Sequence, residues 1–339
     1  LFRDLHALMN IIIVFAGAGI FALFFVITYI SNKVTKPLNE LACITKIVGA
    51  GNFDAKIPEV SSRDEVGILN NSFIQMQKAL KEYIQNFELT TKAKEKIQSE
   101  LKIARDIQMG IIPKIFPPFP NHPDIDIYAV LQPAKEVGGD LYDFFFIDDE
   151  HLCFAIGDVS DKGVPASLFM AITRTLLRAK TIKGMKPAAV LKSMNEALCQ
   201  DNESAMFVTF FMAILNLKTG AMQYANAGHN PPYFMRKDFK VEEFPKPKDM
   251  PLGIVERDYS DFDAKLEKGD SIFLFTDGVN EAISSGGGFY GDPRLAEALK
   301  KAAGQKPRGI INLVLDELKD FTAGAEQSDD ITIMAVRYF

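Results

Sequence analysis

The chain has 339 residues, of which 47% are hydrophobic and 24% are charged, and its formal net charge is −6. This length predicts two or more domains, and the composition excludes a disordered chain. The acidic balance lacks the basic footprint of a nucleic-acid-binding protein. The three cysteines, Cys43, Cys153 and Cys199, lie far apart, which favours a reducing compartment over a disulfide framework or a zinc site.

The N-terminal part of the chain is an apolar run. Residues 7–30 carry almost no polar side chains, and a helix of this length crosses the roughly 30 Å of a bilayer core. Lys33 and Lys36 follow the run and only Arg3 precedes it, which favours a cytoplasmic C-terminal side. We predict a transmembrane helix at residues 7–30 in the inner (plasma) membrane. The chain starts at Leu1 rather than Met, so we expect that the protein has preceding sequence, such as a sensor domain, that this chain does not include.

Two amphipathic helices are expected after this run. The first is short, and the second begins near Asp64. Spacings of three and four residues along the second helix give a heptad seam, typical of bundled helices; its members are Val66, Leu69, Phe73, Met76, Leu80 and Tyr83. So narrow an apolar stripe cannot bury itself alone, which implies a dimer. The register continues to Ile111, and prolines from Pro113 onward end the helix.

This arrangement of span, proline, helix, connector and helix resembles a HAMP domain at residues 31–84. The resemblance implies a parallel four-helix bundle made by two chains, which relays signals from a membrane segment to a cytoplasmic output. A coiled-coil signalling linker would then occupy residues 85–112. The alternative is a passive dimer spacer.

From residue 125 onward the pattern changes to short strands and helices. Alternating apolar runs predict strands at 125–131, 141–147, 152–156, 208–217, 222–227, 271–275 and 331–337. Helices are expected at 164–179, 187–198, 293–303 and 307–321. Hairpins interrupted by helix pairs predict an α+β domain, with antiparallel sheets and helices outside them.

Four aspartates lie where strand-like runs begin or end: Asp140, Asp158, Asp277 and Asp329. Carboxylates in such places are costly to bury, and four that converge would repel one another without a cationic partner. Two hard divalent cations, Mn²⁺ or Mg²⁺, would solve this because they prefer oxygen ligands. A water shared by two such ions ionises near neutral pH, so the set predicts a two-metal hydrolase.

Residues beside these aspartates fit the same interpretation. Gly139 and Gly278 are expected to remove side chains where a metal or substrate approaches closely. Strand alternation at Asp329-Asp330 predicts that one carboxylate points inward and the next outward. The Gly138-Gly139-Asp140 triplet lacks the Glu-Phe of a diguanylate cyclase, and the phosphoacceptor helix and ATP lid of a histidine kinase are not visible.

Five ordered motifs resemble the SpoIIE-type branch of the metal-dependent serine/threonine protein phosphatases, the PPM or type 2C phosphatases. The motifs are residues 137–143, 157–166, 226–232, 275–282 and 328–332. The resemblance covers roughly residues 100–339, and we place the phosphatase domain at 120–339. It implies an αββα sandwich of two antiparallel sheets flanked by helices.

The resemblance also implies a role for each aspartate. Asp158 should bridge the two ions, with a possible ligand from the Val159 carbonyl. Asp277 and Asp329 should hold one ion, and Asp140 should serve the other. Outer ligands are expected among Glu281 and Asp143.

Other residues are less securely matched to the family. Many family members grip phosphate with an arginine, and Lys135 is the nearest basic residue here that would replace it. His229, in a glycine-proline turn, is expected to be structural rather than a proton carrier.

The resemblance further suggests a substrate. It implies a phosphorylated STAS-domain anti-sigma-factor antagonist, which dephosphorylation would let capture its anti-sigma partner. Two alternatives stay open: a non-catalytic module that binds a signalling partner, and a two-metal hydrolase of a small phosphoester. The expected partners are therefore the phosphoprotein, a second copy of the chain and the membrane, with no nucleic acid.

Overall fold

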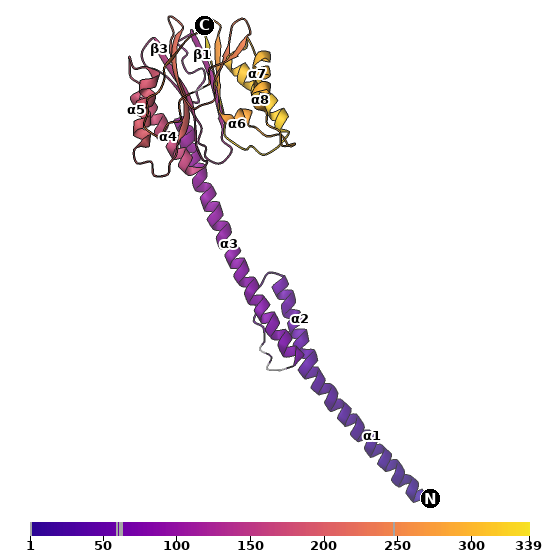
Figure 1. The fold of residues 1–339 in the computed structure, drawn as a ribbon. Helices are drawn as coiled ribbons and strands as arrows, with labels where there is room; N and C mark the ends of the chain where they lie inside the picture. Colours follow the sequence, from indigo (N-terminus) through magenta and orange to yellow (C-terminus); the bar gives the residue numbers. More distant parts are fainter. Residues whose placement is uncertain (1, 59, 61–63, 247) are drawn as a thin grey trace. The chain divides into compact units, whose positions relative to one another are not determined.

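The computed structural model describes residues 2–58, 60, 64–246 and 248–339 (Figure 1). The chain divides into two compact units, residues 1–97 and residues 98–339. The first unit is helical, and its elements are α1 (Phe2–Ile30), a π-helical turn (Ser31–Thr35), α2 (Lys36–Gly49) and the beginning of α3 (Glu65–Ile111).

One helical stretch of the first unit is long and apolar enough to cross a membrane. It covers Leu5–Gly49, and the mean hydropathy of its most apolar window is 2.8. None of that window is buried by the rest of the chain. This finding rests on length and composition alone, and it agrees with the span predicted from the sequence.

Hydrogen bonds tie the connector between α2 and α3 to the start of α3. The Asp64 carboxylate accepts a hydrogen bond from the Val66 amide at 3.1 Å, which satisfies one of the free amides at the helix N-terminus. The Gln77 side chain donates to the Phe53 carbonyl at 3.1 Å and to the Ala55 carbonyl at 2.8 Å. These contacts hold α2 and α3 as one local unit.

The predicted heptad seam of α3 is largely uncovered in the single chain. Val66 is buried, but Leu69, Met76, Leu80 and Tyr83 expose between 37% and 68% of their surface. An apolar stripe of this kind is what a bundle completed by a second chain requires. The homodimer stays a prediction.

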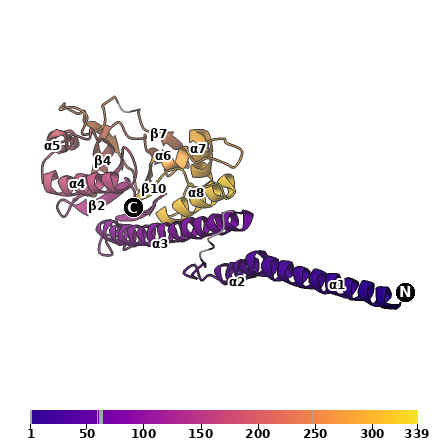
Figure 2. The ribbon, with the colours of Figure 1, turned by 90° about the horizontal axis from the view of Figure 1, so that it is seen from below.

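The second unit is a sandwich of two five-stranded antiparallel sheets (Figures 1 and 2). Sheet A has the order β1-β10-β9-β6-β7, and sheet B has the order β2-β3-β4-β5-β8. The strands are β1 (Ile125–Gln132), β2 (Leu141–Phe146), β3 (His151–Val159), β4 (Val208–Asn216), β5 (Ala221–Ala227), β6 (Tyr233–Met235), β7 (Val241–Glu243), β8 (Phe262–Lys265), β9 (Ser271–Phe275) and β10 (Ile331–Tyr338).

Helices cover both outer faces of this sandwich. On sheet B lie α4 (Val164–Lys180) and α5 (Pro187–Cys199), and on sheet A lie α7 (Gly291–Lys301) and α8 (Pro307–Thr322) (Figures 1 and 2). A one-turn helix, α6 (Asp277–Asn280), follows β9. The αββα sandwich predicted from the sequence is therefore confirmed.

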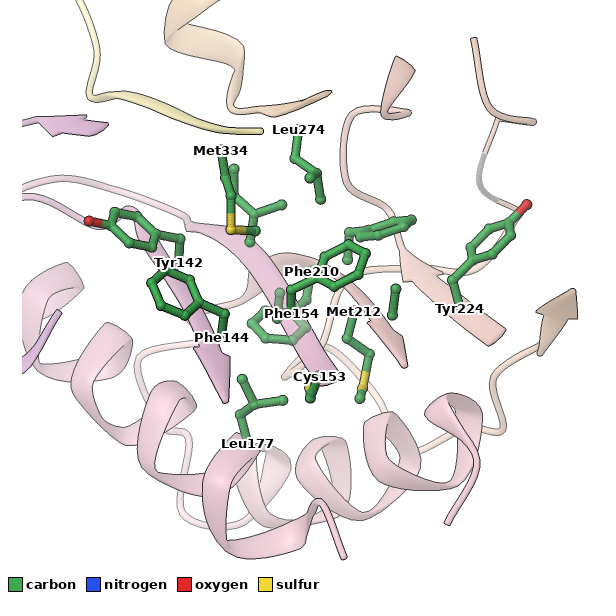
Figure 3. Packing of buried hydrophobic residues seen from close by; sticks show 14 of the residues in the cluster. Tyr142, Phe144, Cys153, Phe154, Leu177, Phe210, Met212, Tyr224, Leu274 and Met334 are labelled. Carbon is green, nitrogen blue, oxygen red and sulfur yellow. The ribbon is translucent and has the colours of Figure 1, made fainter. Parts of the chain in front are cut away.

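The core between the sheets is built from large side chains of both. Tyr142, Phe144 and Phe154 of sheet B are buried in one cluster with Leu274 and Met334 of sheet A (Figure 3). Each fully buried side chain of this size contributes about 1.5–3 kcal/mol. Because this cluster fixes the two sheets against each other, it also fixes the strand ends next to it.

Candidate active site

The four predicted aspartates meet at one end of the sandwich. Asp140 precedes β2, and Asp158 lies near the end of β3, where the pairing of Leu141 with Gly157 brings the two strands side by side. On sheet A, Asp277 follows β9 and Asp329 precedes β10, and these strands are also paired. Antiparallel pairing within each sheet therefore brings the acidic residues to a common edge.

Asp140 lies deepest of the four. It is 2% exposed, and its Oδ2 accepts hydrogen bonds from the Thr276 hydroxyl at 2.7 Å and the Thr332 hydroxyl at 2.5 Å. Burial, followed by the charge of Asp158, raises the pKa of Asp140 well above its usual range. Two threonine hydroxyls, from the end of β9 and the start of β10, thus orient the carboxylate that precedes β2.

Asp158 and Asp277 are held in the same negative field. Burial raises the pKa of Asp158 to about 7, and the charges of Asp277 and Asp329 add to the effect. Burial and then the charge of Asp329 raise the pKa of Asp277 to about 6. A cation bound nearby would favour the ionised form of carboxylates whose pKa is raised in this way.

Asp329 is the site aspartate that forms an ion pair with a basic side chain, Lys162. Its Oδ2 lies 2.8 Å from the Lys162 Nζ, which also donates to the Ser328 carbonyl at 2.6 Å. Burial alone would lower the pKa of Lys162, but the Asp329 carboxylate raises it above its ordinary value. One ammonium does not balance four carboxylates, so the site retains an excess of negative charge.

Asp330 has a role that the sequence did not suggest. It is buried, and its carboxylate accepts hydrogen bonds from the Ala134 and Gly139 amides, both at 2.8 Å. The Asp140 amide lies 3.4 Å from the same carboxylate. Asp330 therefore holds the segment that carries Asp140, whereas Asp329 takes the half-exposed position at the site.

The glycines beside the aspartates make room for protein atoms. A Cβ atom on Gly138 would overlap the Asp330 carboxylate, and one on Gly278 would overlap the Asp330 backbone carbonyl. A Cβ on Gly139 would lie 2.9 Å from the Val159 carbonyl oxygen. Close approach of protein atoms is thus one reason for glycine at positions 138, 139 and 278, and the expected approach of a metal or substrate at Gly139 and Gly278 stays a prediction. The same contact places the Val159 carbonyl beside the Asp140 segment.

Gln108, near the end of α3, binds the same segment from the other side. It is 6% exposed, its amide donates to the Gly138 carbonyl at 2.6 Å, and its side-chain oxygen accepts from the Gly138 amide at 3.2 Å. This pair of hydrogen bonds joins α3 to the residue two positions before Asp140. The sequence offered no signal for it beyond a polar lapse in an apolar seam.

Three other candidates lie differently from the expectation. Asp143 is fully buried on the α4 side of sheet B, where Arg178 binds both of its oxygens at 2.6 and 2.7 Å and Arg174 lies 3.1 Å away, so it is no metal ligand. Lys135 is exposed, and within the described residues it forms no ion pair with the four aspartates. Glu281 is exposed but close enough to Asp277 to raise its pKa.

His229 has a structural setting. It is 1% exposed, its Nε2 lies 3.1 Å from the Phe275 carbonyl, and its Nδ1 lies 2.8 Å from the Thr209 hydroxyl. A carbonyl can only accept, so Nε2 carries the proton and Nδ1 accepts from Thr209. Both ring nitrogens are thus occupied in the neutral form.

This setting makes folding stability depend on pH. Burial lowers the pKa of His229 to about 4, so between pH 6.5 and pH 4 the unfolded chain binds the proton more readily and stability falls as pH falls. We expect the stability advantage of the wild type over His229→Gln to shrink by about 2 kcal/mol between pH 7 and pH 5. Urea unfolding of both proteins at the two pH values measures this difference; a difference that does not change with pH would contradict the assignment.

The donor set fits hard divalent cations. Asp140, Asp158, Asp277 and Asp329 offer only oxygen ligands, and their charge exceeds that of Lys162, as a site for Mn²⁺ or Mg²⁺ requires. Among the residues that the structure describes, no group of three or more His, Cys, Asp or Glu side chains has the arrangement of a formed metal site. The fit to divalent cations therefore rests on the oxygen chemistry of these side chains and on their excess of negative charge.

Comparison with known proteins identifies the family. The profile of the family described as Stage II sporulation protein E (SpoIIE) matches residues 148–339, more than half of the chain. The chain belongs to the SpoIIE family. The profile of the HAMP domain matches residues 29–82 of this SpoIIE-family chain. Asp158, Asp277 and Asp329 lie inside the first match, and Asp140 lies just before it.

Individual relatives agree with the family assignment. The SpoIIE-family chain is 34% identical over 249 residues to "Phosphoserine phosphatase RsbU" of Bacillus subtilis, covering 72% of this chain and 71% of the relative. It is 29% identical to "Protein IcfG" of Synechocystis over 96% of this chain, which spans 54% of the length of that relative. The solved SiaA-PP2C domain of Pseudomonas aeruginosa shares the fold, with a TM-score of 0.65 at 23% identity over 73% of this chain and 99% of the domain.

Proposed function

We propose that this chain is a membrane-anchored, Mn²⁺- or Mg²⁺-dependent protein phosphatase that hydrolyses phosphoserine or phosphothreonine. The observation that carries the proposal is the convergence of four aspartates, from both sheets, at one end of a SpoIIE-family sandwich. Asp158, Asp277, Asp329 and Asp140 would hold two ions, with the Val159 carbonyl and Glu281 as further candidates. When bound, such ions supply an activated water and stabilise charge on the phosphoryl group.

Other residues of the site orient the Asp140 carboxylate or fix the backbone that carries it. Thr276 and Thr332 orient Asp140 through their hydroxyls. Asp330 accepts from the Ala134 and Gly139 amides, and Gln108 binds the amide and the carbonyl of Gly138. A site whose ligands are oriented before the substrate arrives loses less free energy to reorganisation during the reaction.

The substrate that we propose is a serine-phosphorylated STAS-domain antagonist of an anti-sigma factor. Support comes from the relatives, because RsbU and RsbP of Bacillus subtilis are named phosphoserine phosphatases. A groove of about 510 Å³ between α8 and the segment before β10 borders Gly278 and Ser328, next to two of the aspartates. A protein segment has room there beside its phosphorylated residue.

The test is phosphate release by the full chain in detergent. With the phosphorylated STAS-domain protein as substrate, we expect release with Mn²⁺ and none after EDTA. Equal or faster turnover of p-nitrophenyl phosphate would instead favour a hydrolase of small phosphoesters. A chain that binds no Mn²⁺ in a calorimetric titration would favour a non-catalytic partner-binding module.

Regulation is proposed to run from the HAMP domain along α3. This helix is continuous from Glu65 to Ile111, a distance of 47 residues, and it carries Gln108. The Gln108–Gly138 contact is the point at which this helix reaches the segment that carries Asp140. The membrane anchor, the homodimer and the cytoplasmic position of the catalytic unit belong to this proposal.

Insertions into α3 test the relay. Four residues inserted before Ile97 break the heptad register, whereas seven residues preserve it. We expect the four-residue insertion to change phosphate release by the full chain at least fivefold and the seven-residue insertion to leave it within twofold. Equal activities of the two insertion variants would count against a relay through the helix register.

A further inference from the structure

Lys162 is a basic side chain that the fold aims at the acidic site. It lies in the loop between β3 and α4, four residues after Asp158. Its Nζ is 2.8 Å from the Asp329 Oδ2 and donates to the Ser328 carbonyl at 2.6 Å. The side chain is still 37% exposed, so the ammonium contacts the carboxylate and also faces solvent.

The loop that carries Lys162 is fixed by its own hydrogen bonds. The Ser160 amide donates to the Phe207 carbonyl at 2.8 Å, and the Phe207 amide donates to the Ser160 hydroxyl at 3.0 Å. Left-handed backbone at Asp161 and Gly163, with φ of 65° and 86°, turns the chain sharply on both sides of Lys162. The direction of the side chain therefore follows from the backbone.

Three other basic residues were compared with Lys162. Arg174 and Arg178 bind Asp143 on the α4 side of sheet B. Lys135, which the sequence suggested for the phosphate, is exposed. A doubly charged phosphoryl group beside four carboxylates needs a cationic partner from the protein as well as metal ions.

We propose that Lys162 contacts a phosphoryl oxygen of the substrate. Once Asp329 serves as a metal ligand, its negative charge is shared, and the Lys162 ammonium can turn to another anion within reach of its flexible stem. This inference rests on the proposed function, because it assigns to the same site the side chain that grips the phosphate. Lys162 then contributes to the affinity for the phosphoryl group more than to the affinity for the metal ions.

Phosphate affinity of the full chain tests this proposal. Lys162→Met keeps the length of the stem and removes the charge, and Lys162→Arg keeps the charge. Lys135→Met is the control, because Lys135 is an exposed lysine for which no ion pair with the four aspartates is found among the described residues. With Mn²⁺ present, we expect Lys162→Met to raise both the dissociation constant of inorganic phosphate and the KM for the phosphoprotein at least tenfold. Lys162→Arg should recover most of the loss, and Lys135→Met should stay within twofold of the wild type.

Calorimetric titration with Mn²⁺ alone separates a phosphate role from a positioning role. We expect Mn²⁺ to bind Lys162→Met at least as tightly as the wild type, because the competing ammonium is gone. Phosphate affinity that does not change in Lys162→Met, or Mn²⁺ affinity that falls in parallel with it, would overturn the proposal. Phosphate binding is measured without turnover, so a wild type that binds phosphate but releases none from phosphoproteins would count against the proposed function alone.

Discussion

Replacing Asp158 by asparagine is expected to lower metal-dependent phosphate release by at least about 1000-fold, which corresponds to about 4 kcal/mol of transition-state stabilisation. The charge of Asp158 raises the pKa of Asp140, and the charges of Asp277 and Asp329 raise the pKa of Asp158, so Asp158 is close to all three. An asparagine removes the negative charge on which two cations would depend. Phosphate release with Mn²⁺, measured beside Asp161→Asn, checks the result, since Asp161 is an exposed acidic residue of the same loop.

The stability of this variant should move in the opposite direction. Without metal, the Asp158 carboxylate is repelled by its neighbours, so Asp158→Asn should be at least as stable as the wild type in EDTA. Saturating Mn²⁺ should stabilise the wild type by about 3 kcal/mol at 100 times its dissociation constant and the variant much less. A variant that keeps a tenth of the activity, or the full response of Tm to Mn²⁺, would refute a bridging role.

Replacing Asp330 by alanine is expected to damage folding and catalysis together. The change leaves the buried amides of Ala134 and Gly139 without their acceptor. Each such group costs about 1–3 kcal/mol, so we expect the free energy of unfolding to fall by about 2–6 kcal/mol. Because the same segment carries Asp140, phosphate release should also fall, and urea unfolding and Mn²⁺-dependent activity measure the two effects.

Asp330→Asn is the matched variant for this experiment. It keeps the size and one acceptor oxygen, and we expect an intermediate loss of stability. An Asp330→Ala protein as stable as the wild type would show that water replaces the carboxylate. Full activity in a destabilised protein would show that the segment does not position Asp140.

Much of the architecture followed from the sequence because the longer strands carry strong apolar patterns. The residues predicted as strands at 125–131, 208–217 and 331–337 agree with β1, β4 and β10 to within one residue at each end. The strands β6, β7 and β8 were missed. They have three or four residues each, which is too short for an alternation to show.

The candidate site was predicted in part for a similar reason. Aspartates that flank strands can be recognised from the sequence, and pairing in two antiparallel sheets brings them to one end. Asp143 could have been excluded by strand alternation, because it lies in β2 three positions after Asp140, and an odd spacing places two side chains on opposite faces of an extended chain. Asp330 and Gln108 could not have been found, because their partners lie 191 and 30 residues away in the sequence.

The contact between Gln108 and Gly138 joins two neutral amides through two hydrogen bonds. Dissolved salt screens ion pairs such as Lys162–Asp329, but it has little effect on a buried pair of uncharged groups. The link between α3 and the catalytic end of the sandwich should therefore persist through changes of ionic strength. This contact would keep its geometry at ionic strengths that mask the surface charges of the domain.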